Sequence, residues 1–393
     1  MRRFGGLEGL RAWLAWTVVF SHIMSFTGLS QLLPWLAHAV GQAADCSVMV
    51  FTILSGFVIS HLLLARREPY PRYVVRRFLR IYPVYAVALL AGIGGTCLAF
   101  DTFLSHPWGD LTPATQRMLL QSESLAGGDL PWHLAAHLSL LHGAVSSQVL
   151  YESQYMFLGP AWSLSLEWQF YLVAPLVVTL AMHRLGQVLL TALAIWGYAL
   201  YTKGVFGEFM LPSVLPGAGL YFGVGIATRF LIKASADIAA FPLALLMLVT
   251  GLLMNATGTS PILIWAAFVC IMLLNEEASD LASRGARWTF AKAFDSRLVR
   301  WLGERSYATY LIHMPIVQLV TWVCVTQLGM GLVQTGATAV LVAVPGTLIA
   351  STLLHRYVEL PAIQWGRRMA WLRSSPTPEA TPRPRPGTAS GSA

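Results

Sequence analysis

Two apolar stretches of this sequence contain ionisable side chains at positions that would lie inside a membrane. Trp162-Ser163-Leu164-Ser165-Leu166 opens an apolar run that continues to about His183, and Glu167 lies about six residues inside it. An earlier apolar run carries Arg11 and His22. A carboxylate at such a depth costs on the order of 3 kcal/mol on insertion scales, so a residue of this kind marks a functional site by default. A carboxylate beside an imidazole fixes its tautomer and stabilises its protonated form, which a general base requires.

The spacing of these residues predicts that they meet. His22 follows Arg11 by eleven residues, which is about 16 Å along a helix, and Glu167 would lie about 9 Å inside its own run. Since Glu167 enters from the opposite end, we expect it to lie at the depth of His22 and to orient that imidazole. The alternative is that His22 only makes a helix–helix hydrogen bond.

A second group of candidates is the arginine-rich stretch that precedes Ile81-Tyr82-Pro83. On a helix, Arg77 and Arg80 share one face, and Arg76 shares a face with Arg80. Guanidinium forks bind phosphates bidentately, which predicts an anion site. The alternative is a basic helix that contacts anionic lipid.

Three further features have both a structural and a functional interpretation. Ser55-Gly56-Phe57 interrupts an apolar run, where glycine allows close helix packing or clears room for a ligand. Pro315 should kink the helix that carries His313 and free backbone groups nearby. The histidines at 133, 137 and 142 resemble a metal patch, but a polar loop helix explains them more simply, and the four cysteines show no metal spacing. We therefore expect no metal.

The elements that position these residues are membrane helices. Of the 393 residues, 56% are hydrophobic and only 11% are charged, which excludes a soluble domain and predicts an all-α, polytopic membrane helical bundle. The basic start Met1-Arg2-Arg3 resembles a signal peptide, but we expect a retained first span. We count ten apolar spans, near 10–30, 46–65, 81–101, 161–183, 186–203, 209–229, 238–255, 260–276, 305–327 and 333–356.

The basic residues predict the orientation of the bundle. If the N-terminus is cytoplasmic, 24 of the 26 Lys and Arg residues fall in inside segments, and only Arg117 and Lys203 fall outside. This positive-inside bias predicts that both termini are cytoplasmic. The net charge of +8 is thereby explained without nucleic acid. We expect a multi-pass domain over residues 1–365, an outside segment over about 102–160, and a disordered cytoplasmic tail over 366–393.

Taken together, these motifs resemble the acyltransferase 3 family of bacterial integral membrane proteins. The resemblance covers most of the chain in order, and each motif is weak alone. It rests on Leu7-Glu8-Gly9-Leu10-Arg11 with His22, Leu54-Ser55-Gly56-Phe57, Arg76-Arg77-Phe78-Leu79-Arg80, Trp162 to Glu167, Ser306-Tyr307 with Tyr310 and His313, and Val358-Glu359-Leu360-Pro361.

The resemblance implies a function and roles for the matching residues. The family transfers acyl groups, commonly acetyl, from cytoplasmic acyl-CoA to hydroxyls of envelope carbohydrates, lipids or small metabolites. It implies an enzyme of the cytoplasmic membrane in which His22, Arg11 and Glu167 are catalytic and Arg76, Arg77 and Arg80 handle the donor. The acceptor would be a carbohydrate or a lipid-linked molecule. We expect the substrate pocket to include Ser55, Trp162, Ser165, Tyr310, His313 and Asp45.

One position departs from the family pattern. The acidic residue that usually precedes the Ser-Gly-Phe motif is Met49 here, and Asp45, one turn earlier on the same helical face, is the candidate substitute. Some relatives also carry an appended hydrolase-like domain, which we do not expect in this chain. The rival function is a proton-coupled transporter or flippase that uses His22 and Glu167 as a relay.

Overall fold

The computed structural model describes residues 6–65, 68–105, 107–109, 113–234, 249, 260–277 and 289–369. Within these ranges the regular structure is entirely helical, which confirms the all-α prediction. The main helices are α1 (Leu7–Phe26), α3 (Pro34–Ala65), α4 (Tyr70–Phe103), α7 (Trp162–Ala181), α8 (Arg184–Thr202), α9 (Leu215–Ala234), α11 (Ser260–Glu277), α14 (Ser306–Trp322) and α15 (Leu332–Leu354). Shorter helices are α2 (Leu29–Leu32), α5 (Pro113–Ser124), α6 (Leu130–Leu138), α13 (Arg297–Glu304) and α16 (Leu360–Arg368).

Seven helical segments in the described part are long and apolar enough to cross a membrane. They are Pro34–Ala65, Tyr70–Phe103, Gly159–Ala181, Arg184–Thr202, Leu215–Ala234, Ser306–Gln327 and Leu332–Arg368. The predicted spans at 10–30 and 260–276 coincide with α1 and α11, which are helical but not among these seven, and the span at 238–255 lies outside the described residues. The count of ten and the cytoplasmic position of both termini therefore stay predictions.

The helices α3 and α4 are longer than the apolar runs that predicted them. They contain 32 and 34 residues, about 50 Å each, against a hydrocarbon core of about 30 Å. Hydropathy ends a span at the first polar residues, whereas a helix continues until a residue breaks it. For the same reason α16 continues to Arg368, three residues into the segment predicted to be a disordered tail, whose remainder from 370 lies outside the described residues.

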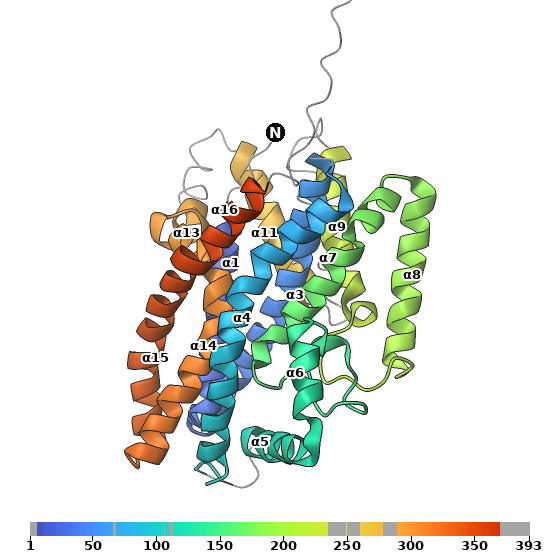
Figure 1. The fold of residues 1–393 in the computed structure, drawn as a ribbon. Coiled ribbons are helices and arrows are strands. Elements are labelled where there is room, and N and C mark those ends of the chain that lie inside the picture. The colour runs from blue at the N-terminus through green and yellow to red at the C-terminus, as the bar shows by residue number, and fades with distance from the viewer. Residues whose placement is uncertain are drawn as a thin grey trace, which may run out of the picture.

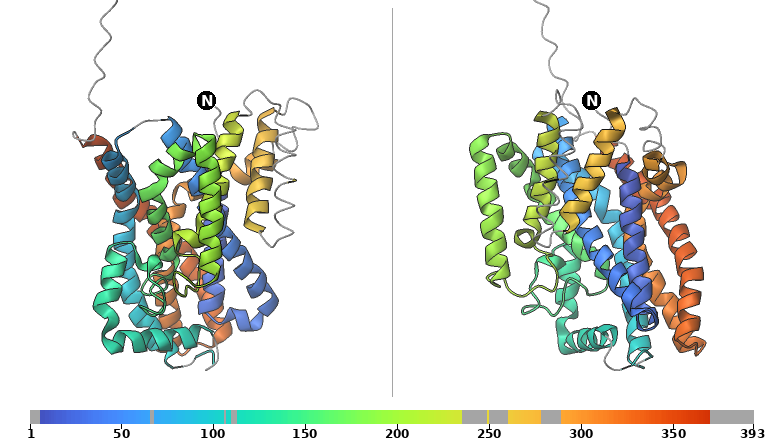
Figure 2. Two further views of the ribbon diagram at one scale, coloured as in Figure 1. Left: turned by 90° about the vertical axis from the view of Figure 1, so that its right-hand side faces the viewer. Right: turned by 180° about the vertical axis from the view of Figure 1, so that it is seen from behind.

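The long helices stand side by side, and the first described residues lie at the same end of the bundle as α13 and α16 (Figure 1). At the opposite end, which we call the α5 end, α5 lies across the bundle (Figures 1 and 2). The helix α1 packs against α3 and α14, and α14 also packs against α4 and α15. In contrast, α8 stands at the edge and is largely exposed, as a lipid-facing helix would be.

Glycines bring α3 and α9 into backbone contact. A Cβ atom on Gly56 would lie 2.3 Å from the Phe222 carbonyl oxygen, and one on Gly225 would lie 1.9 Å from the Ile53 carbonyl oxygen. Both distances are far below van der Waals contact, so no side chain fits at either position. Gly56 therefore has the close-packing role that membrane-helix glycines usually have.

The three histidines near the α5 end are buried, which corrects the expectation of a polar loop helix. His133, His137 and His142 are all fully inaccessible to solvent. The rings of His137 and His142 stack with centroids 4.2 Å apart, and the Tyr85 hydroxyl donates a hydrogen bond to the His137 carbonyl at 2.9 Å. No group of three or more His, Cys, Asp or Glu side chains that could hold a metal ion occurs in the described part of the chain.

These buried histidines predict a pH dependence of stability. Burial lowers the pKa of His133 and of His137 to about 4, so the unfolded chain binds more protons between pH 6.5 and pH 4. The free energy of unfolding should be unaffected above pH 6.5 and should fall as the pH drops to 4, by up to about 3 kcal/mol per histidine. Thermal unfolding in detergent should show a shallower acid-side loss for His137→Gln than for the exposed control His38→Gln. If both variants lose the same free energy of unfolding between pH 6.5 and pH 4, the burial of a neutral His137 does not cause the acid-side loss.

Candidate active site

A cavity of about 250 Å³ lies between α1, α3, α4, α7 and α14. Its walls combine cations, one carboxylate and several hydroxyl groups. The polar side chains that line it are Arg11, Thr52, Ser55, Arg77, Arg80, Ser163, Glu167, Tyr171, Ser306, Tyr307 and Tyr310. The structure thus brings together Arg11, Ser55, Arg77, Arg80, Glu167 and Tyr310, which the sequence predicted for one site.

Glu167 is held in this cavity by two hydroxyl groups. The Tyr171 hydroxyl donates to Glu167 Oε1 at 2.5 Å, and the Ser55 hydroxyl donates to the same oxygen. No hydrogen bond joins Glu167 to His22 in the described part of the chain, although we expected Glu167 to orient that histidine. The side chain of Glu167 therefore presents an oriented carboxylate to the cavity, next to Arg77 and Tyr171.

The hydrogen-bond partner of His22 is another histidine. His22 Nδ1 lies 2.9 Å from His313 Nε2, and the two rings stack with centroids 5.1 Å apart. His313 Nδ1 lies 3.1 Å from the Thr309 carbonyl oxygen. We call His22 and His313 the histidine pair.

The Thr309 carbonyl determines which nitrogens of the histidine pair carry hydrogens. A carbonyl only accepts, so His313 Nδ1 must donate to it, and a neutral His313 then has a lone pair on Nε2. That lone pair accepts the Nδ1 hydrogen of His22, which leaves a lone pair on His22 Nε2. His22 is half-buried, so the arrangement presents a general base with a fixed tautomer.

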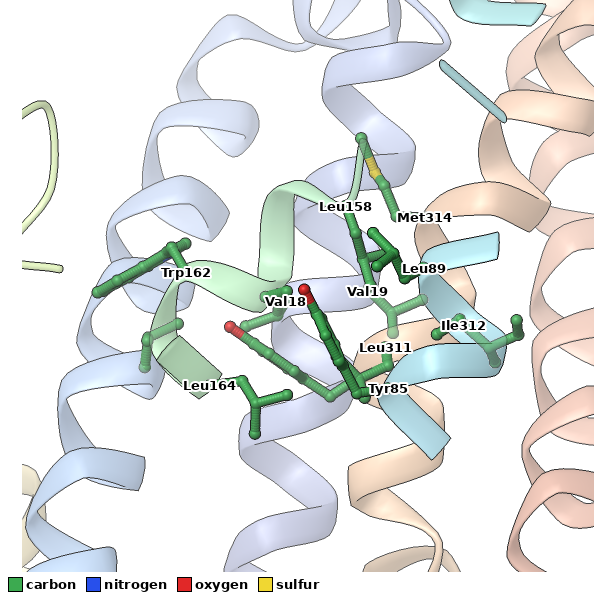
Figure 3. Close-up of a cluster of buried hydrophobic side chains, with 14 of the residues drawn as sticks. Val18, Val19, Tyr85, Leu89, Leu158, Trp162, Leu164, Leu311, Ile312 and Met314 are labelled. Carbon is green, nitrogen blue, oxygen red and sulfur yellow. The ribbon is translucent and has the colours of Figure 1, made fainter. Parts of the chain in front are cut away.

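An apolar cluster holds the helices that carry the histidine pair. Val18 and Val19 of α1, within about one turn of His22, pack with Leu311, Ile312 and Met314 of α14 and with Tyr85 and Leu89 of α4 (Figure 3). Ala15, Val19, Leu311 and Val317 are fully buried. Close packing of this kind leaves α1 and α14 little freedom to rotate, so it fixes the direction of both imidazole rings.

Tyr310 connects the cavity to the histidine pair. Its hydroxyl lies 3.0 Å from the Ser163 hydroxyl inside the cavity, and its ring centroid lies 6.3 Å from that of His313. The pair therefore adjoins the cavity wall on the side of Ser163. Arg11 lies in the second turn of α1 and Arg77 in the third turn of α4. Both arginines therefore lie toward the end of the bundle where the first described residues lie, which we call the N-terminal end.

The predicted donor-binding arginines have different environments. Arg77 lines the cavity and lies about 6 Å from the ring centroids of Tyr73 and Tyr171. Its buried Nε has no hydrogen-bond partner within the described ranges. Arg11 also has a buried Nε without a hydrogen-bond partner among the described residues, and Arg11 pairs with Glu8 at 3.8 Å. Arg76 instead forms an ion pair with Glu68 at 2.9 Å and does not line the cavity.

Arg80 is paired with a residue that we did not predict for the site. Its guanidinium donates to Oε1 of Glu359, whose other oxygen lies 2.9 Å from His355 Nδ1. Glu359 belongs to the Val358-Glu359-Leu360-Pro361 motif, and this was the available sequence signal. It lies far from Arg80 in the sequence, and nothing in local spacing connects the two.

Four predicted pocket residues, Trp162, Ser165, His313 and Asp45, lie outside the cavity lining, and so does His22. Trp162 belongs to the apolar cluster (Figure 3). Ser165 is buried, donates to the Leu140 carbonyl at 2.8 Å and accepts from the Gly143 amide at 3.0 Å, so it anchors the preceding loop to α7. Asp45 is exposed on α3, and it is not positioned in the cavity as a substitute for the missing acidic residue at Met49.

Comparison with known proteins agrees with the resemblance noted in the sequence. A family model described as an acyltransferase domain matches residues 4–356. The chain belongs to the acyltransferase 3 family. No solved structure matches it.

Several relatives of this acyltransferase 3 protein are named for acyl transfer. It is 24% identical to the peptidoglycan O-acetyltransferase OatA of Listeria monocytogenes over 90% of this chain and 55% of that protein. It is 22% identical to the putative O-acetyltransferase SAR0937 of Staphylococcus aureus over 96% of this chain and 60% of that protein. It is 25% identical to the acyltransferase MdmB of Streptomyces mycarofaciens over 98% of this chain and 97% of that protein. The chain thus spans somewhat more than half the length of the first two relatives.

Proposed function

We propose that this protein is a membrane O-acyltransferase that moves an acetyl group from cytoplasmic acetyl-CoA to a hydroxyl of an envelope carbohydrate. The observation that supports the proposal is the arrangement around one cavity. Arg11 and Arg77 line it toward the end of the bundle where the first described residues lie, and each has an Nε without a hydrogen-bond partner among the described residues. The histidine pair lies beyond Tyr310 on the other side of the cavity. The family membership and the names of the relatives agree with it.

The volume of the cavity limits what it holds. About 250 Å³ is below the range of roughly 300–1,000 Å³ that holds a whole drug-sized ligand. The cavity therefore accommodates a small acyl thioester and part of its arm, while the nucleotide end of the donor stays at the N-terminal end. Arg77 and Arg11 contribute guanidinium groups toward the phosphates.

The transfer step uses the lone pair on His22 Nε2. This nitrogen takes the proton of the acceptor hydroxyl as the hydroxyl oxygen attacks the thioester carbonyl carbon. The C–O bond forms, the C–S bond breaks, and the thiolate of CoA leaves and takes up the proton from His22. The alternative route has two steps. His22 Nε2 first attacks the thioester carbon, so a C–N bond forms, the C–S bond breaks and the CoA thiolate leaves. The acceptor hydroxyl oxygen then attacks the same carbon, so the C–O bond forms, the C–N bond breaks and the hydroxyl proton passes to the thiolate.

The experiment that tests the proposal is thiol release by the purified protein in detergent or nanodiscs. Acetyl-CoA should yield free CoA thiol, faster in the presence of a hydroxylated acceptor. The hydrogen bond between His22 and His313 also suits a proton relay, so a proton-coupled transporter or flippase is the second candidate. A transporter releases no thiol, and the absence of thiol with every acceptor would reject the acyltransferase.

Removing Arg77 should weaken donor binding. Arg77→Ala should raise the KM for acetyl-CoA by roughly 10- to 100-fold, because a charge-assisted contact contributes about 1.5–3 kcal/mol. Steady-state thiol release at varied acetyl-CoA measures this change. Arg300→Ala is the matched control, since Arg300 is half-exposed and paired with Asp295 at the surface. If Arg77→Ala and the control have equal donor KM values, Arg77 is a lipid contact.

His313 should act as a positioning residue for His22. His313→Ala should lower kcat by on the order of 100-fold with a smaller change in the donor KM, because His22 Nδ1 loses its acceptor and its tautomer is no longer fixed. In His313→Gln the amide oxygen can still accept, so kcat should partly recover. The dependence of kcat on pH should shift in the alanine variant. Equal activity of the alanine and glutamine variants would reject a tautomer role.

A further inference from the structure

A cluster of buried polar side chains lies between α5 and the segment 145–158. Arg117 Nε is 3.3 Å from Glu152 Oε2, and the Arg117 guanidinium lies 4.3 Å from the centre of the Tyr155 ring. The side chain of Arg117 is 34% exposed and that of Glu152 is 8% exposed. We call Arg117, Glu152, Ser153, Gln154 and Tyr155 the outer cluster. Its cation is held in place by two neighbours and is still accessible from solvent.

Several polar atoms of the outer cluster are buried without a hydrogen-bond partner. In the part of the chain that the structure describes, neither the oxygen nor the nitrogen of the Gln154 amide has a partner, nor does the Ser153 hydroxyl, and both residues are fully buried. An unsatisfied buried polar group costs about 1–3 kcal/mol, so three such atoms in two consecutive residues call for a reason other than stability.

The backbone of the same segment is strained. Glu152 has φ 40° and Phe157 has φ 59°, and neither is glycine. Left-handed backbone at such residues costs about 1–3 kcal/mol and persists where the surrounding structure enforces it, often at ligand sites. The strain and the unpaired atoms occur within the same six residues, 152–157.

The outer cluster interacts electrostatically with the histidine pair. Arg117 lies within electrostatic range of His22, and Tyr155 lies within electrostatic range of Tyr310. His22 is four residues from the last residue of α1, Phe26, which is about 6 Å along the helix. A ligand bound at the outer cluster would therefore reach His22 from the side opposite the arginines of the cavity.

The chemistry of the cluster indicates the kind of ligand. Arg117 and Glu152 neutralise each other, and residues 113–161 contain three acidic residues, Glu123, Asp129 and Glu152, against the single cation Arg117. This balance disfavours an anionic ligand. Free donors and free acceptors occur side by side, and hydroxyl groups both donate and accept.

We propose that Arg117, Glu152 and Gln154 form the acceptor subsite and that the acceptor is an uncharged, polyhydroxylated molecule, a neutral sugar. This inference rests on the proposed acyl transfer and adds to it the acceptor-binding residues and the charge of the acceptor. Glu152 accepts hydrogen bonds from sugar hydroxyls, Gln154 both donates and accepts, and one hydroxyl reaches His22 Nε2.

Binding and turnover together test the subsite. The probes are three neutral disaccharides, N,N′-diacetylchitobiose, lactose and maltose, and one carboxylate-bearing disaccharide, N-acetylglucosaminyl-N-acetylmuramic acid. Calorimetric titration of the full-length protein in detergent measures binding, and thiol release from acetyl-CoA measures turnover. Gln154→Leu, Glu152→Gln and Arg117→Lys are compared with the matched exposed controls Gln148→Leu and Glu123→Gln.

At least one neutral disaccharide should bind and accelerate thiol release, and should bind more tightly than the carboxylate-bearing one. In each cluster variant, the Kd for that disaccharide and its KM as acceptor should rise at least tenfold. These rises should exceed any change in the KM for acetyl-CoA, and the control variants should match the wild type. Tighter binding of the anionic disaccharide, no binding of any neutral one, or cluster variants that behave like the controls would overturn the proposal. If the sugars bind but thiol never appears, acyl transfer is the part that fails.

Discussion

Replacing His22 with alanine should lower kcat for thiol release from acetyl-CoA by roughly 10²- to 10⁴-fold, the usual contribution of a general base. The reason is that His22 Nε2 has the lone pair left by the hydrogen-bonded chain from the Thr309 carbonyl through His313. The donor KM should change less than kcat, because the arginines that face the donor lie toward the N-terminal end. Steady-state assays of thiol release at varied acetyl-CoA, with the same purified preparations, separate kcat from the donor KM.

The control for this substitution is His38→Ala, since His38 is exposed on α3 and lies outside the cavity lining. The pH dependence of kcat gives a second check. If His22 is the general base, kcat rises with pH as the His22 imidazole loses its proton, and His22→Ala should remove that rise. Full thiol release by His22→Ala would exclude His22 as either base or acyl carrier. If His22→Ala abolishes thiol release but is also no longer folded and monodisperse, His22→Gln makes the test instead, because glutamine is a polar side chain of similar size.

The residues that line the cavity could be predicted because long apolar helices leave few places for charge. Glu167, Arg11 and Arg77 stand out in a sequence where only 11% of residues are charged, and hydrogen-bond satisfaction in lipid drives such groups toward the bundle interior. Hydropathy also placed the helices, and the Ser55-Gly56 step predicted a close helix contact. These inferences need only the composition and the 3.6-residue period.

The partners of these residues could not be predicted in the same way. His22 and Glu167 both lie among the helices, yet each bonds to a partner other than the expected one. The partner depends on the rotation and tilt of each helix, which local spacing does not determine. The apolar cluster around Val19 and Leu311 sets that rotation through contacts far apart in the sequence. The segment 145–158 has no apolar period, so its buried Gln154 and its strained backbone had no sequence signal.

Glu359→Ala should have the largest effect on stability. Both oxygens of this fully buried carboxylate are used, one by Arg80 and one by His355 at 2.9 Å. Removing one partner of a buried pair leaves the other charge uncompensated and costs about 3–5 kcal/mol. The apparent midpoint of thermal unfolding in detergent should therefore fall clearly. Glu359→Gln should fall less, since its amide can still accept from Arg80.

Glu304→Ala is the matched control, because Glu304 is exposed and its pair with Arg305 at 3.4 Å is of the surface type that contributes about 0–1 kcal/mol. The donor kinetics distinguish two roles for Glu359. Arg80 lines the cavity, so a carboxylate that holds its guanidinium there should, when replaced by glutamine, raise the donor KM in protein that remains folded. A Glu359→Gln variant with normal donor KM and lowered stability would make the pair purely structural. A Glu359→Ala variant as stable as Glu304→Ala would contradict the buried pair itself.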